Sequence, residues 1–135
     1  MSIVQSIRPQ AVLLEKDVTL AATSGTAVGI AVPAGVTVLA AGFQNYTVVP
    51  DVATYTLDVT DGTTVFANDL SFDNTAANTN KGGVTPGFVA AADTIDVVTT
   101  ISGSPGTIAG RVWALVIDCG AGTRAATEVD RDQLA

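Results

Sequence analysis

The sequence predicts an all-β protein: a single antiparallel β-sandwich, jelly-roll-like, with an arm at each end of the chain. Short runs rich in Val, Thr and Ile are separated by Gly, Pro, Asn and Asp, which is the pattern of a sandwich or barrel. Helical periodicity is nearly absent. A length of 135 residues suits one domain with one core. Because aromatic residues make up only 5% of the chain, that core must consist mainly of Val, Ala, Ile and Leu.

Composition divides the chain into three segments. We expect an N-terminal arm at residues 1–10 and the β-sandwich domain at 11–119. Residues 120–135 are much more polar, so they are interpreted as a C-terminal tail outside the sandwich.

The first half of the domain is expected to open with three strands, at residues 11–20, 26–32 and 36–43. In the second of these, Val28, Ile30 and Val32 alternate with small residues, which predicts one apolar face. The clearest half-buried strand is 53–60, where every second residue from Tyr55 to Val59 is apolar.

Two hairpins are predicted. Asp61-Gly62 directly follows the strand at 53–60 and leads into TTVFA, and an Asp-Gly pair between two β-runs is a strong hairpin signal.

The segment 69–88 is crowded with Asn, Thr and Gly, so we expect a long loop whose start is anchored by Leu70 and Phe72. The second expected hairpin joins strands at 94–101 and 107–119 through a turn rich in Gly and Pro.

The last of these strands is apolar on both faces, with Val112, Ala114 and Val116 on one and Trp113, Leu115 and Ile117 on the other. This pattern favours a strand that is central or covered on both sides. Trp113 is expected to be the largest single core or interface residue.

Several kinds of chemistry are disfavoured by composition. The chain has no His, which excludes Ser-His-Asp and Cys-His catalysis and His-based zinc sites. Cys119 is the only cysteine, so no intramolecular disulfide forms, and its apolar surroundings predict a buried, inert thiol. No nucleotide-binding glycine motif occurs, and Gly82-Gly83 is interpreted as turn or strand-end glycine. The net charge of −7 argues against a nucleic-acid partner.

The carboxylates give no clear catalytic pair. Asp93 and Asp96, like Asp58 and Asp61, are separated by an odd number of positions, so the members of each pair would point to opposite faces of a strand. We therefore expect no enzyme and no cofactor. No secretory leader and no membrane-spanning run of 18 apolar residues is recognised in the sequence, so we expect synthesis in a cytoplasm and no membrane partner.

Calcium is the remaining metal question. Four carboxylates lie in or before the Asn-rich segment, at Asp58, Asp61, Asp69 and Asp73. Oxygen ligands of this kind suit calcium, but the regular EF-hand spacing is absent. Solvated turn carboxylates are the simpler interpretation, and the sequence leaves both open.

Four segments together resemble the small β-sandwich decoration, or cement, proteins of tailed-bacteriophage heads: VPAGVTVLAAGFQ (32–44), YTLDVTDGTTVFANDL (55–70), ADTIDVVTT (92–100) and GRVWALVIDC (110–119). The resemblance implies a virion structural protein on the outer capsid surface that is not an enzyme. It implies a homotrimer at local threefold positions that bridges subunits of the major capsid protein. It carries over no catalytic residues and no mapped contacts.

Contact residues are instead inferred from the two arms, as Ile3, Val4, Ile7 and Arg8 at the start and Arg124, Glu128 and Arg131 in the tail. The alternative is that both arms are frayed termini. Two other functions stay open: another virion module, such as a head-fibre or tail component, and a carbohydrate-binding or adhesive β-sandwich. The shortage of exposed aromatics counts against the latter.

Overall fold

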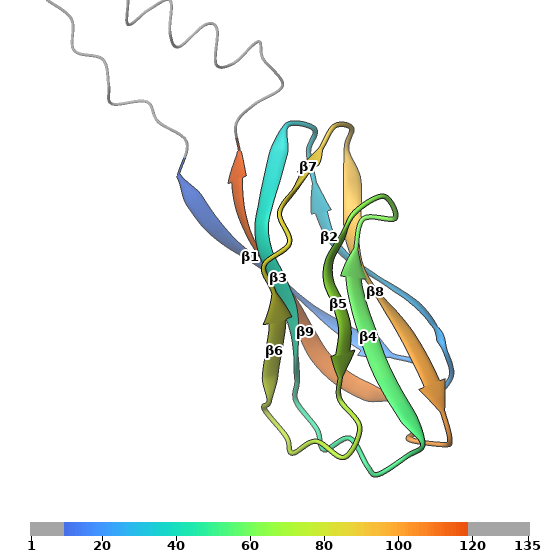
Figure 1. Cartoon of the computed structure of the whole chain (residues 1–135). Coiled ribbons are helices and arrows are strands. Elements are labelled where there is room, and N and C mark those ends of the chain that lie inside the picture. Colours follow the sequence, from blue (N-terminus) through green and yellow to red (C-terminus); the bar gives the residue numbers. More distant parts are fainter. Residues whose placement is uncertain (1–9, 119–135) are drawn as a thin grey trace, which may run out of the picture.

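A computed structural model describes residues 10–118, which form two antiparallel sheets packed face to face (Figure 1). The all-β sandwich predicted from the sequence is confirmed. The strands, in chain order, are β1 (Ala11–Leu20), β2 (Gly25–Val32), β3 (Val36–Asn45), β4 (Thr54–Thr60), β5 (Val65–Ser71), β6 (Asn80–Gly83), β7 (Gly87–Val89), β8 (Asp93–Ser102) and β9 (Ile108–Asp118). Within the described residues, no helix is long and apolar enough to cross a membrane.

The strand order is that of a jelly roll. The first sheet runs β1-β9-β3-β6, with β7 also paired to β3, and the second sheet runs β2-β8-β4-β5. β6 pairs with residues 41–44 of β3 and β7 with residues 36–38, so the two act as one interrupted edge strand. Counted in this way there are eight strands in two four-stranded sheets, and the chain passes repeatedly from one sheet to the other.

The predicted Asp-Gly hairpin joins β4 to β5. Gly62 has a φ of 90°, in the left-handed region that glycine adopts without strain. One carboxylate oxygen of Asp61 accepts hydrogen bonds from the backbone N–H groups of Thr63, at 2.9 Å, and Thr64, at 2.7 Å. The turn is therefore held by the side chain that precedes the glycine.

The second predicted hairpin is wrong. β8 lies in the second sheet between β2 and β4, whereas β9 lies in the first sheet between β1 and β3. The residues between them cross from one sheet to the other, with positive φ at Gly103 and Gly106. Glycine-rich turns serve hairpins and inter-sheet connections alike, so the turn residues did not distinguish the two.

The long loop expected at 69–88 contains more structure than predicted. β5 extends to Ser71, and β6 and β7 add two short strands to the edge of the first sheet. Phe72 anchors the segment as expected, because it is fully buried and its ring meets that of Phe43 edge-on at a centroid distance of 5.6 Å. Backbone pairing needs no apolar side chain, which is why a Gly- and Asn-rich run forms strands here.

The core lies between the sheets and is built mostly from Val, Ala, Ile and Leu, with a few aromatic rings. The predicted alternation in β2 fails at one point: Ile30 and Val32 are buried, but Val28 is 59% exposed. A β-bulge between Ala27 and Ile30 shifts the register and places Gly29 in the core instead.

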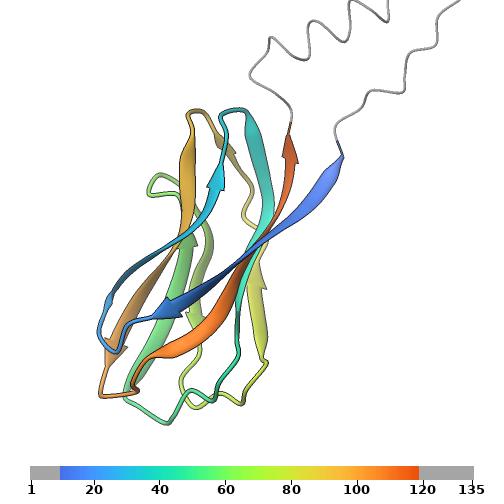
Figure 2. The same ribbon diagram turned by 180° about the vertical axis from the view of Figure 1, so that it is seen from behind.

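β9 is central in the first sheet, as its two apolar faces predicted. Val112, Ala114 and Val116 point into the core, and the alternate set from Trp113 to Ile117 is half-buried on the outer face. β1 is the edge strand of this sheet and runs obliquely along β9, as the reverse view shows (Figure 2). The start of β1 and the end of β9 lie at the same end of the sandwich, since Ala11 pairs with Ile117.

Candidate functional site

The outer face of the first sheet carries the most distinctive set of side chains in the described part of the chain. Strand register arranges them in four rows across β1, β9, β3 and the edge strand, namely Ala11-Ile117-Thr37-Phe88, Leu13-Leu115-Ala40, Glu15-Trp113-Gly42-Gly82 and Asp17-Arg111-Gln44-Asn80. The first two rows are mainly apolar and the last two mainly polar. We call them the apolar half and the polar half of the outer face.

The apolar half is open to solvent. Leu13 is 52% exposed and Phe88 is 57% exposed, while Leu115 and Ile117 between them are half-buried. Isolated exposed apolar residues are ordinary, but a contiguous set on one sheet face is typical of an interaction surface. This half lies at the end of the sandwich where the described chain begins and ends.

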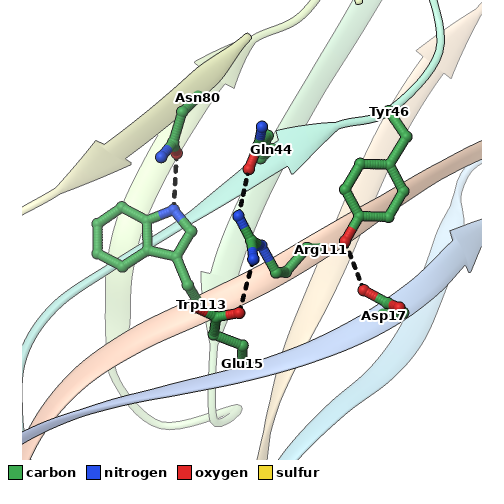
Figure 3. Close-up of polar contacts among 7 residues, drawn as sticks. All are labelled: Glu15, Asp17, Gln44, Tyr46, Asn80, Arg111 and Trp113. Atoms are coloured by element: carbon green, nitrogen blue, oxygen red, sulfur yellow. Dashed lines mark hydrogen bonds and ion pairs between the residues drawn. The ribbon is translucent and has the colours of Figure 1, made fainter. Parts of the chain in front are cut away.

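Arg111 organises the polar half (Figure 3). Its Nη1 donates to Glu15 Oε2 at 2.7 Å, and its Nη2 donates to Gln44 Oε1 at 2.6 Å. Glu15 comes from β1, Arg111 from β9 and Gln44 from β3, so the guanidinium ties three strands together. Both charged side chains are about one-third exposed, so the ion pair contributes little to stability but fixes the geometry of the surface.

Trp113 lies across two glycines. A Cβ on Gly42 would sit 2.5 Å from indole Cζ2, and one on Gly82 would sit 2.6 Å from the same atom. The ring therefore occupies the space that side chains at these two positions would fill. Its Nε1 donates to Asn80 Oδ1 in β6 at 2.7 Å, which fixes the far end of the ring (Figure 3).

Tyr46 lies beside the polar half of the outer face, next to Asp17. Its hydroxyl donates to Asp17 Oδ1 at 2.5 Å, joining the end of β3 to β1. This hydrogen bond raises the pKa of Tyr46 above its ordinary value, and desolvation and the negative charge of Asp17 act in the same direction. The phenol therefore stays protonated as a donor throughout the neutral range.

Two shallow cavities adjoin these residues. One has a volume of about 230 Å³ and is lined by Leu13, Glu15, Asn80, Arg111 and Trp113. The other, of about 360 Å³, is lined by Glu15, Lys16, Asp17, Tyr46 and Arg111. The first combines an indole face with amide, guanidinium and carboxylate groups, and we call it the Trp113 cavity.

Three of the four carboxylates considered for calcium accept hydrogen bonds from backbone N–H groups in turns, loops and bulges. Asp58 accepts from the N–H of Asp69 at 2.7 Å, and Asp73 accepts from the N–H of Val52 at 2.7 Å. Asp61 holds its own hairpin turn, as described above. Within residues 10–118, no three His, Cys, Asp or Glu side chains come together in a way that would hold a metal ion.

Glycines 82 and 83 lie at the end of a strand, which is one of the two places the sequence suggested. Their role is in packing, since Gly82 lies beneath the indole of Trp113. A Cβ on Gly83 would come within 3.0 Å of Ala67 in the facing sheet.

The contact residues inferred from the arms, Ile3, Val4, Ile7, Arg8, Arg124, Glu128 and Arg131, all lie outside the described residues, as does Cys119. The outer-face residues were missed as a site. The sequence predicts Trp113 only as a core or interface residue. Because neighbouring residues of a strand point to opposite faces, the buried Val112 was the signal that could have assigned Trp113 to the outer face. The two glycines beneath the ring, Gly42 and Gly82, could not be identified without the register of β3 and β6.

Comparison with known proteins adds no relative. No protein-family model matches this sequence, and a search of curated proteins finds no match.

Proposed function

We propose that this protein is a virion structural protein that binds the outer surface of a phage capsid and stabilises the shell by bridging subunits of the major capsid protein. The observation that carries the proposal is the exposed apolar half of the outer face, at the end of the sandwich where both arms join the described domain. In this proposal the protein is made in the host cytoplasm and ends on the virion, without a nucleic-acid or membrane partner.

The fold and the resemblance support this proposal from different directions. Jelly rolls recur in viral capsid domains, although a fold alone does not establish a function. The four segments that resemble decoration proteins fall on strands of both sheets, including β3, β4, β5, β8 and β9.

A structural role also agrees with the chemistry of the outer face. The polar side chains there are engaged with one another, as in the pairs Arg111–Glu15 and Tyr46–Asp17. Such pairs make a fixed surface rather than a reactive centre, so we propose a binding protein and not an enzyme.

We further propose a homotrimer, because a weak contact made three times gains affinity through effective concentration. The arms at 1–10 and 120–135 would extend each subunit's contacts across a boundary between capsid subunits. Light scattering on the full-length chain tests the oligomer, and a trimer is the expected result.

Capsid binding is tested by co-sedimentation with expanded empty heads made from the major capsid protein of the same virus. Saturable binding is expected. Phe88→Ser removes an exposed ring whose burial is worth about 1.5–3 kcal/mol, so binding should weaken by roughly 10- to 100-fold. Val28→Ser is the matched control, because Val28 is 59% exposed on the other sheet. A chain that never binds heads, or equal effects of the two variants, would contradict the proposal.

A further inference from the structure

Trp113 is the only tryptophan of the chain, and its indole is held as a rigid platform on the outer face. The backbone at Gly42 and Gly82 lies beneath the ring, and the bond from Nε1 to Asn80 Oδ1 prevents it from turning. The ring also lines the Trp113 cavity, so it presents an apolar surface to a ligand in that cavity. Preorganisation of this kind lowers the entropic cost of binding.

Both hydrogen-bond donors and hydrogen-bond acceptors surround the indole platform. Glu15 supplies a carboxylate acceptor and Arg111 supplies guanidinium donors. The Oδ1 of Asn80 is occupied by the indole N–H, and its Nδ2 makes no hydrogen bond to the residues that the structure describes. A bound molecule therefore meets one flat apolar surface, an acceptor and donors within a single cavity.

Charge balance narrows the class of ligand. Arg111 is paired with Glu15, so the cavity offers no uncompensated charge to an anion. A cationic ligand would meet one aromatic ring rather than an aromatic cage, and would face the guanidinium as well. A nucleic acid is disfavoured by the net charge of −7. A neutral ring with an apolar face and hydroxyl groups at its edge fits every group in the cavity.

The volume of the cavity restricts the class of ligand further. The cavity volume of about 230 Å³ falls below the roughly 300–1,000 Å³ of sites for drug-sized ligands. One ring, with the chain continuing over the open sheet face, matches this volume.

We propose that the Trp113 cavity is a subsite for one neutral pyranose ring of a glycan, stacked on the indole and hydrogen-bonded through Glu15, Asn80 and Arg111. This binding activity is additional to capsid binding. It uses the polar half of the outer face together with Leu13, which lies where the apolar half borders the cavity. The shortage of aromatics in the sequence had counted against sugar binding, but a single well-placed ring is enough for one subsite.

The test is a fluorescence titration of the full-length protein, since the single tryptophan lies in the proposed subsite. One arm uses neutral hexoses and their oligosaccharides, and a second uses N-acetylhexosamine oligosaccharides. A saturable change in emission in at least one arm is expected, with a dissociation constant on the order of millimolar for a single ring. No saturable change in either arm, or tighter binding of a sialylated sugar than of its neutral counterpart, would overturn the proposal.

Variants separate the subsite from nonspecific binding. Asn80→Ala should weaken binding by roughly 2- to 10-fold, as expected when one hydrogen-bonding side chain of the subsite is removed. Trp113→Ala, followed by calorimetry because the fluorophore is lost, should abolish it. Asn68→Ala is the matched control, since Asn68 is an exposed asparagine on β5 of the other sheet. Folding is checked by circular dichroism, and equal affinities of Asn80→Ala and Asn68→Ala would refute the subsite. The protein is titrated alone, so the result is independent of capsid binding.

Discussion

Gly82→Ala tests whether the position of the Trp113 indole requires a glycine beneath the ring. The added Cβ would lie 2.6 Å from indole Cζ2, 2.9 Å from Cη2 and 2.8 Å from the carbonyl oxygen of Ala41. These separations are shorter than a van der Waals contact, so the ring must lift away and its hydrogen bond to Asn80 must stretch or break. Overpacking of this kind costs about 1–3 kcal/mol.

Urea unfolding followed by fluorescence measures this cost, because Trp113 is the only tryptophan. We expect a lower midpoint and, in the folded state, an emission maximum shifted to longer wavelength as the ring becomes more exposed. Gly25→Ala is the matched control. A Cβ there meets no atom within 4 Å, so the stability of this variant should change by less than about 0.5 kcal/mol. If the two variants have the same midpoint and emission, the described ring position is wrong.

Two further variants test the core and the hairpin turn. Tyr55 is 1% exposed and its hydroxyl has no hydrogen-bond partner among the described residues, so Tyr55→Phe should raise the free energy of unfolding by about 1 kcal/mol in urea titrations at pH 7. Burial raises the pKa of Tyr55 from 10.0 to about 12, so the unfolded chain loses this proton first as the pH rises. Stability should therefore fall by on the order of 2 kcal/mol between pH 10 and 12, and Tyr55→Phe should lose less; equal losses would contradict the assignment. Asp61→Ala removes the acceptor for Thr63 and Thr64 and should cost about 1 kcal/mol, whereas Asp61→Asn keeps an acceptor oxygen and should stay close to the wild type in the same assay.

Local signals in the sequence were enough to predict most of the strands. The alternation at 53–60 and the Asp61-Gly62 turn led to a hairpin that the structure confirms, because side-chain parity and turn chemistry act between neighbours in the chain. The apolar pattern of β9 likewise predicted its central place. These features depend on few residues close in sequence.

The errors concern partners that are far apart in sequence. No local sequence signal shows that the chain passes from one sheet to the other between β8 and β9. The change of sheet is determined by the pairing of each strand with partners that are distant in sequence. The bulge that exposes Val28 depends on the pairing of β2 with β8. The Trp113 platform needs β9, β3 and β6 in one register, so the candidate site emerges only with the assembled sheet.

The edge strand β1 shows how one sequence separates the two halves of the outer face. Among the strands that the structure describes, β1 pairs with β9 alone, so within residues 10–118 its other edge has no strand partner. Along residues 15–17 (EKD), consecutive charges discourage another strand from pairing there, which is how natural sheets protect an edge. Residues 11–14 (AVLL) carry no charge, and Val12 and Leu13 are each about half exposed. The exposed apolar stretch at 11–14 therefore leaves the edge unprotected next to the apolar half, where the proposed protein contact lies. The charged stretch borders the polar half, where the Trp113 cavity is open to a small ligand.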